Sequence, residues 1–310
     1  MTTPPSGRTA QDEELTAYAS AVGAYVLWGF LPLYYLFLHA VPAEQLVAQR
    51  IVWSVVLVGA VLAVVRRLDE VVAVFTDPGR LWRLALSATI LAANWLIFII
   101  GIDAHRVLEI SFGYFINPLV SVALGTVFLG ERLSRGQQLA VAISMVAIAL
   151  QAWGLGSFPW ISLALAFSFG TYGLIRKTVS VGAAPGLLVE AVVLAPIALG
   201  YLVWQDIEGV LVFGPGIGMM AVIAASGVVT ALPLILFARG VRGLPLTTIG
   251  ILQYFAPSLH FVLAIVVFGE PLDPMRLASF ALIWLSLAVF TRDLLRKRAR
   301  ALEAARNPVV

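Results

Sequence analysis

Residues 111–133 read SFGYFINPLVSVALGTVFLGERL, a run long and apolar enough to cross a lipid bilayer. A helix-breaking pair, Asn117-Pro118, lies inside this run, and a second pair, Gly130-Glu131, closes it. Proline has no backbone N–H and its ring clashes with an earlier carbonyl, so it bends a helix. In lipid, the freed carbonyl must be satisfied by protein or by a wet cavity. The stretch therefore predicts a membrane helix that borders such a place.

The whole chain has the composition of a membrane protein. Of its 310 residues, 61% are hydrophobic and 12% are charged, and the mean hydropathy is +0.96. A soluble domain is nearer about 45–50% apolar and about 25% charged. The alternating ten-residue segments of a membrane β-barrel are absent. These features predict an all-α, polytopic membrane protein, and the lack of cysteine excludes thiol catalysis and disulfides.

Ten membrane spans are predicted, at residues 17–38, 42–65, 81–103, 107–129, 137–153, 158–177, 185–204, 216–238, 245–268 and 274–294. With the N-terminus inside, all lysines and arginines except Arg50, Arg106 and Arg276 fall on the inner face or in the tails. This bias predicts a bacterial inner (plasma) membrane protein with both termini in the cytoplasm. The basic tail at residues 295–310 is expected to contact anionic lipid rather than nucleic acid.

An internal repeat links two of these spans. When YFINPLVSVALGTVFLGERL is compared with YFAPSLHFVLAIVVFGEPL, Pro118 aligns with Pro257 and Gly130 with Gly269. The offset is close to half the chain and covers five spans, so the second copy is inverted. Inverted repeats are typical of secondary transporters, whose substrates bind between the two copies near the membrane midplane. We therefore expect two inverted five-helix repeats around a central cavity.

The predicted organisation follows from this repeat. Residues 1–16 form a cytoplasmic tail, residues 17–153 the first five-helix repeat, residues 154–294 the second, and residues 295–310 the basic cytoplasmic tail. The N-terminal stretch lacks the features of a cleaved signal peptide, so the first span is expected to stay in place.

Several motifs together resemble one family. GAYVLWGFLPLYY, QRIVWS, NWLIFI, GYFINPLVSV, FLGERL, LALAFSFGTYGLIRK and QYFAPSL are similar to the RarD branch of the EamA group, within the drug/metabolite transporter superfamily. The resemblance covers residues 17–294 and implies a ten-helix inner-membrane permease with a central cavity. Many EamA repeats carry a lysine at the cavity end of the first span, where this chain has Leu36. A coupling role for that lysine is therefore not carried over.

Charged side chains inside membrane spans are costly, so they are candidates for function. Arg50 lies in the second span and Glu190 in the seventh, its counterpart in the repeat. Arg50 offers a rigid fork of donors and is predicted to contact the substrate. Glu190 is the candidate for proton coupling. A permanent ion pair between the two is the structural alternative, and Glu109, near the start of its span, is expected in the headgroup region.

Uncharged candidates complete the predicted site. Aromatic and amide side chains can stack on a flat substrate or hydrogen-bond to it, although most such residues only pack. The predicted substrate-binding residues, besides Arg50, are Trp28, Trp53, Asn94, Trp95, Tyr114, Asn117, Tyr172, Gln253 and Tyr254. Pro118 and Pro257 are the predicted hinges, and His260 is expected to be a satisfied polar residue.

These features favour a secondary transporter of small organic metabolites or drug-like molecules that works by alternating access, either facilitative or proton-coupled. A channel-like facilitator and an integral membrane lipid-modifying enzyme are the alternatives, but neither a selectivity filter nor a clustered catalytic constellation is visible. No phosphate-binding glycine loop occurs and the three histidines are scattered, so no ATP, cofactor or metal is expected. Small-residue patterns fit packing within one copy and within a homodimer equally.

Overall fold

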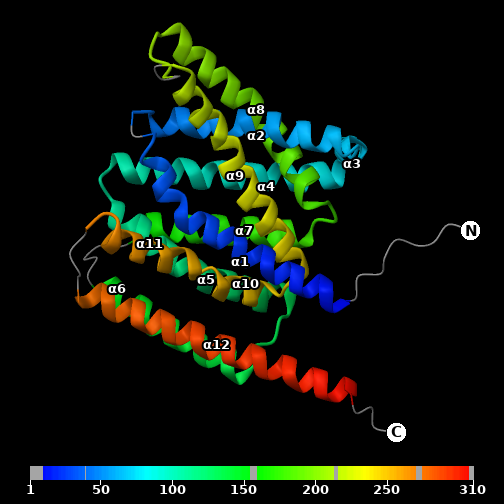
Figure 1. The fold of residues 1–310 in the computed structure, drawn as a ribbon, viewed down its shortest axis with the longest axis vertical. Helices are drawn as coiled ribbons and strands as arrows, with labels where there is room; N and C mark the ends of the chain where they lie inside the picture. Colours follow the sequence, from blue (N-terminus) through cyan, green and yellow to red (C-terminus); the bar gives the residue numbers. More distant parts are fainter. Residues whose placement is uncertain (1–9, 39, 154–158, 213–215, 270–273, 307–310) are drawn as a thin grey trace, which may run out of the picture.

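The computed structural model describes residues 10–38, 40–153, 159–212, 216–269 and 274–306, and in these ranges the chain is helical with no strand (Figure 1). The helices are α1 (Ala10–Tyr35), α2 (Ala43–Val64), α3 (Leu68–Phe75), α4 (Pro78–Asp103), α5 (Val107–Leu129), α6 (Arg135–Trp153), α7 (Trp160–Thr178), α8 (Ala183–Ile207), α9 (Ile217–Gly243), α10 (Leu246–Leu252), α11 (Phe255–Val266) and α12 (Pro274–Arg306). The predicted all-α, polytopic architecture is confirmed.

Nine stretches of the described residues are long and apolar enough to cross a membrane, with α10 and α11 together forming one of them. The remaining predicted span, at residues 158–177, corresponds to α7, a 19-residue helix that does not meet the same standard and carries Arg176 and Lys177 in its last turn. Helix α1 already begins at Ala10, and α12 runs on to Arg306, so the described part of both tails is helical.

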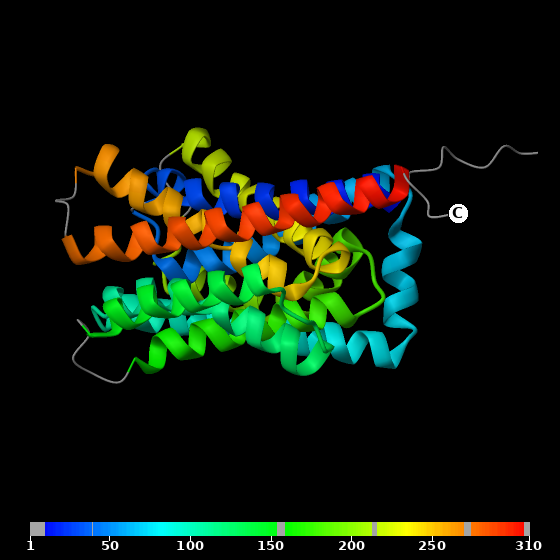
Figure 2. The same ribbon diagram turned by 90° about the horizontal axis from the view of Figure 1, so that it is seen from below.

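The long helices run roughly alongside one another, and α1 begins at the same end of the bundle at which α12 ends (Figure 1). The short helix α3 lies across this end, as Figure 2 shows, and was not predicted. It is amphipathic, with Val71 and Val74 buried and Val72 exposed. We call this the basic end of the bundle, because Arg66 and Arg67 follow α2 here.

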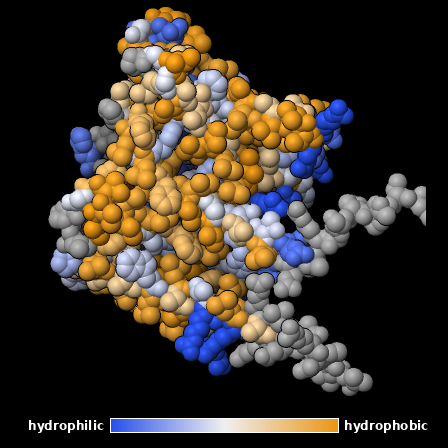
Figure 3. All heavy atoms as spheres, in the orientation of Figure 1, coloured by the Kyte–Doolittle hydropathy of each residue, from blue (hydrophilic) through white to orange (hydrophobic). Residues whose placement is uncertain are grey.

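Most of the face in Figure 3 is apolar, and hydrophilic patches lie toward its edges. Large hydrophobic side chains such as Val64, Phe128 and Ile197 are exposed on the outside of the bundle. An apolar exterior of this extent is what a helix bundle presents to lipid, since no hydrophobic force favours burying it there. The surface therefore agrees with a membrane-embedded chain.

Helices from the two parts of the chain alternate in the packing. Helix α1 packs on α9 and α11, α2 on α8 and α9, α4 on α7 and α8, α5 on α7 and α10, and α6 on α12. The main buried cluster accordingly combines residues of α1 and α2 with residues of α8 and α9. The first and second predicted repeats are thus interleaved rather than packed as two separate bodies.

The two prolines of the sequence repeat have different effects. The predicted ninth span is divided into α10 and α11 by a turn at Gln253 and Tyr254. Pro257 follows this turn, and the carbonyl with which its ring would clash in a continuous helix is that of Gln253, four residues earlier. Pro118 lies inside α5, which is not interrupted. One of the two predicted breaks is therefore present, at the position that proline sterics require.

Candidate functional site

A cavity of about 180 Å³ lies inside the bundle. Its walls come from α1, α2, α4, α5, α7, α9 and the broken segment α10–α11. The lining residues are Tyr25, Trp28, Leu31, Tyr35, Arg50, Leu91, Asn94, Trp95, Phe98, Gly113, Tyr114, Asn117, Leu165, Phe169, Leu234, Gln253, Ala256, Pro257 and His260. Most of these residues lie in the half of their helices away from the basic end, so the cavity is displaced toward the opposite end.

The structure brings most of the predicted site together in this cavity. The predicted residues in the lining are Arg50, Trp28, Asn94, Trp95, Tyr114, Asn117, Gln253 and Pro257. Tyr25, Tyr35 and Phe169 also line it but were not predicted, because in the sequence they look like any other aromatic residue of a membrane helix.

Arg50 occupies the centre of the polar part of the wall. Its Nε donates to Thr230 Oγ1 at 2.6 Å and its Nη1 donates to the Tyr35 hydroxyl at 3.1 Å. The guanidinium also lies over the Trp95 ring, 5.2 Å from the ring centroid. These contacts hold the guanidinium in a fixed orientation, yet all of them are to neutral groups.

Three amide side chains also contribute polar atoms to the lining. Asn94 Nδ2 donates to Leu165 O at 3.0 Å and to Ser168 Oγ at 2.8 Å, which ties α4 to α7. Asn117 and Gln253 are buried, and each carries a side-chain oxygen that has no hydrogen-bond partner among the described residues. Buried acceptors without a partner are costly, so they are usually explained by function. These two oxygens are free to accept from a ligand.

Tyr114 and His260 are in contact with each other in the lining of the cavity. Their rings are arranged edge to face, with centroids 6.4 Å apart. His260 Nε2 lies 3.0 Å from Trp28 O, so its hydrogen bond joins α11 to α1. This contact agrees with the prediction that His260 is a satisfied polar residue.

An aromatic plug lies below the cavity, toward the basic end; we define it as Tyr25, Trp28, Phe169, Tyr172 and Phe237. Phe237 is at its centre, stacked on Tyr172 at 5.9 Å and in contact with the other three rings. Tyr172, a predicted substrate contact, is fully buried in this plug and does not line the cavity. Tyr25, Trp28 and Phe169 of the plug line the cavity, and Phe237 and Tyr172 pack behind them.

Glu190 lies outside the cavity lining, and its ion-pair partner is Arg176 rather than Arg50. Arg176 Nε is 3.7 Å from Glu190 Oε1, and both side chains are almost completely buried. The Ser87 hydroxyl donates to Glu190 Oε1, and the Tyr172 hydroxyl donates to Oε2 at 3.4 Å. The suggested Arg50–Glu190 pair is therefore wrong, because α7 supplies a nearer cation. The carboxylate contacts the plug through Tyr172.

Trp53 and Tyr254 also lie outside the lining. Trp53 donates from Nε1 to Gln49 Oε1 at 3.2 Å and packs in a separate cluster. Tyr254 is fully buried, and its hydroxyl donates to Phe115 O at 3.3 Å. The repeat predicts equivalent positions for Tyr114 and Tyr254, but only Tyr114 lines the cavity, whereas Tyr254 lies in the turn between α10 and α11 and bonds to α5.

Glu109 and Glu131 serve structural contacts at opposite ends. Glu109 pairs with Arg106, three residues earlier. Glu131 follows Gly130, whose left-handed backbone (φ 64°) ends α5. Its two carboxylate oxygens accept from the first backbone N–H groups of α10, at 2.6 Å and 2.8 Å. Glu131 thus joins the end of α5 to the start of α10, whereas Glu270 lies outside the described residues.

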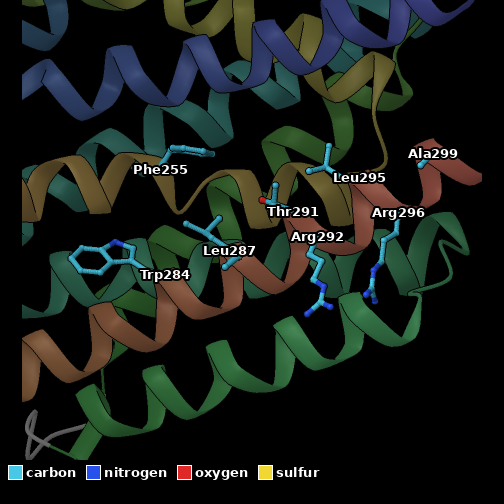
Figure 4. Close-up of a pocket in the computed structure, with 9 residues that line it drawn as sticks. Phe255, Trp284, Leu287, Thr291, Arg292, Leu295, Arg296 and Ala299 are labelled. Atoms are coloured by element: carbon cyan, nitrogen blue, oxygen red, sulfur yellow. The ribbon is translucent and has the colours of Figure 1, made fainter.

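A second hollow, of about 690 Å³, lies on the outside of the bundle along α12. Figure 4 shows its side chains spaced along α12, with Phe255 facing them from α11. Its lining is mostly apolar, with Thr291, Arg292 and Arg296 as the polar members, and it contains none of the predicted substrate-binding residues. We therefore place the functional site in the inner cavity, which contains most of them.

Known proteins are similar to this chain over nearly its whole length, although no family model matches it. Protein RarD of Streptomyces exfoliatus is 42% identical over 304 residues, which cover 97% of this chain and 96% of the relative. An uncharacterized transporter of Pseudomonas aeruginosa is 42% identical and covers 91% of this chain and 95% of itself. The chloramphenicol-sensitive protein RarD of the same organism is 33% identical, with 90% and 96% covered.

One solved structure, described only as the crystal structure of a protein, has a TM-score of 0.68 with this chain. It covers 88% of this chain and 96% of its own length at 18% sequence identity, so the likeness concerns the fold alone. The similarity to RarD proteins is far higher and extends from end to end. On that evidence, the chain belongs to the RarD family of membrane transporters.

Proposed function

We propose that this protein is a secondary transporter that moves small organic molecules through the inner cavity by alternating access. The observation that carries the proposal is a cavity with a fixed guanidinium and unpartnered amide oxygens inside an otherwise apolar bundle. Polar groups at membrane depth are tolerated where they line a water-filled path or a binding site. If Arg50 had only a structural role, a carboxylate of the protein would be expected to pair with it.

Two inverted repeats, with α7 as the tenth span, are the architecture that we propose for this transport. The helix contacts support it. If α1, α2, α4, α5 and α6 are exchanged with α7, α8, α9, α10–α11 and α12, each of the main contacts either becomes another observed contact or is unchanged. For example, α1 on α9 becomes α7 on α4. Gly130 and Gly269, which the sequence aligns, also share the same left-handed backbone.

The closed end of the cavity indicates how access would alternate. The aromatic plug and the bridge from Glu131 to α10 both lie on the side of the basic end, which we propose to be cytoplasmic. The structure then corresponds to a state closed to the cytoplasm. Opening that side requires Phe237 to separate from the rings of α1 and α7, with the turn between α10 and α11 as the natural hinge.

The test is flux into proteoliposomes that contain the purified protein. Radiolabelled probes should include chloramphenicol, the compound in the name of one relative, and small aromatic acids. We expect saturable uptake that is accelerated by unlabelled probe inside the vesicles, because counterflow requires alternating access. Arg50→Gln and Tyr114→Ala should abolish uptake while the protein still inserts and melts normally. Uptake equal to that of empty vesicles for every probe would refute transport, and uptake without counterflow would indicate a channel.

A further inference from the structure

The cavity carries positive charge that the described residues do not neutralise. Its nineteen lining residues include one arginine, Arg50, but no aspartate or glutamate. No described carboxylate forms an ion pair with Arg50, and the buried carboxylate of Glu190 is already bound to Arg176. An arginine keeps its proton even when it is partly buried. A cation held in this way attracts an anion from the water that enters the cavity.

The geometry of the guanidinium indicates what kind of anion fits. Arg50 uses Nε and one Nη1 hydrogen in its bonds to Thr230 and Tyr35. The Nη2 group and the second Nη1 hydrogen have no described partner, so one edge of the fork remains open. Two parallel N–H groups on such an edge match the two oxygens of a carboxylate.

The walls beside this edge favour a flat apolar body attached to the anion. Trp95 lies against the guanidinium face, and Trp28, Phe98 and Phe169 extend the aromatic surface. The cavity of about 180 Å³ corresponds to the space of about six waters at about 30 Å³ each. This is room for a molecule built on a single ring rather than for a large drug.

The amides of Asn117 and Gln253 add a second recognition element. Each has a buried oxygen for which the described part of the chain supplies no partner, and an amide oxygen can only accept a hydrogen bond. A ligand that carries a hydroxyl or amino group on its ring would satisfy one of them. Helix α5 supplies the Asn117 amide and the α10–α11 turn supplies the Gln253 amide, so such a ligand would contact either α5 or the proposed hinge.

We infer that the cavity binds an aromatic monocarboxylate that bears a hydrogen-bond donor on its ring. The Arg50 fork binds the carboxylate, the aromatic wall stacks on the ring, and the amide oxygens accept from the donor. This inference rests on the proposed function, since it takes the cavity to be the transport site, but it concerns equilibrium binding and can be tested without flux.

The test compares matched probes on the full-length protein in detergent, by isothermal titration calorimetry. The probes are 4-hydroxybenzoate, its neutral amide 4-hydroxybenzamide, and benzoate, which lacks the hydroxyl. We expect 4-hydroxybenzoate to bind at least about tenfold more tightly than the amide and more tightly than benzoate. Equal affinity for acid and amide, or no binding by any probe, would overturn the inference on the wild-type protein alone.

Variants then assign the preference to Arg50. Arg50→Gln should remove the preference for the acid, and Arg50→Lys should keep part of it. Arg106→Gln is the control, because Arg106 pairs with Glu109 and lies outside the cavity lining. An unchanged preference in Arg50→Gln would refute the assignment. A preference for the acid without any flux would support the ligand class and refute transport. Flux of neutral probes alone would support transport and refute the ligand class.

Discussion

Substitution of Glu190 by glutamine tests the buried network behind the aromatic plug. The change keeps the size of the side chain but removes the negative charge, and the single amide oxygen can accept from only one of Ser87 and Tyr172, which donate to different carboxylate oxygens. Arg176 would stay charged with only 1% of its surface exposed. Its Nη2 would retain the bond to Ala183 O at 3.0 Å, which does not replace a counter-ion.

The expected loss of stability follows from the separation of the two charges. At 3.7 Å, and with an effective dielectric constant of about 20, Coulomb's law gives an attraction of about 4.5 kcal/mol. Removing one partner of a buried pair costs about 3–5 kcal/mol in other proteins, because it leaves the second charge uncompensated. We therefore expect Glu190→Gln and Arg176→Gln each to lower the free energy of unfolding by about 3–5 kcal/mol, and the double variant to lose far less than the sum.

The free energies would be measured by reversible unfolding in mixed micelles of dodecyl maltoside with increasing sodium dodecyl sulfate. Glu70→Gln is the matched control. It breaks a surface pair with Arg67 whose side chains are 36% and 53% exposed, so its effect should stay below about 1 kcal/mol. Losses that simply add in the double variant would show that Glu190 and Arg176 do not interact. Unchanged stability in Glu190→Gln, together with loss of pH-dependent flux, would instead support the prediction that Glu190 carries protons.

Two further substitutions test the contact between α5 and α10. In Gly250→Ala, the new methyl carbon would lie 2.5 Å from the Pro118 carbonyl oxygen, so the free energy of unfolding should fall by about 1–3 kcal/mol. The control is Gly200→Ala, whose methyl group meets no atom within 4 Å, so its effect should be neutral or slightly stabilising. Equal effects of the two variants in unfolding titrations would rule out the close approach. Glu131→Ala leaves two N–H groups at the start of α10 without their acceptor and should lower the free energy of unfolding by about 1–2 kcal/mol. Glu131→Gln should have a stability between those of Glu131→Ala and the wild type. Wild-type stability in both variants would mean that the bridge does not form.

Much of the fold could be predicted from hydropathy and spacing. Nine of the ten predicted spans correspond to stretches with the length and composition of membrane helices, because about 20 apolar residues leave few other solutions. Helix α3 was missed, since a short amphipathic segment at the membrane surface looks like a connection. The different outcomes at Pro118 and Pro257 could not be foreseen, because both sequences carry the same local signal and only packing decides whether the helix continues.

The candidate site could be predicted for residue types that are rare in membrane spans, such as arginine, and not for the common aromatic residues. Arg50 is a lone arginine within a membrane span, and the structure places it in the cavity. Trp53, Tyr172 and Tyr254 do not line it, because which face of a helix turns inward depends on neighbours that the sequence does not name. Glu190 was placed in the correct span, but its partner Arg176 was assigned to the cytoplasmic face and so was not considered.

The most direct test of the central claim is the accessibility of the cavity from the two sides of the membrane. The natural chain has no cysteine, so Ala256→Cys introduces a single thiol into the cavity lining. Ala147→Cys, at a fully buried position of α6, is the control and should not react. We predict that a membrane-impermeant maleimide labels Ala256→Cys in right-side-out and in inside-out vesicles. Labelling from one side only, in every condition, would contradict alternating access through this cavity.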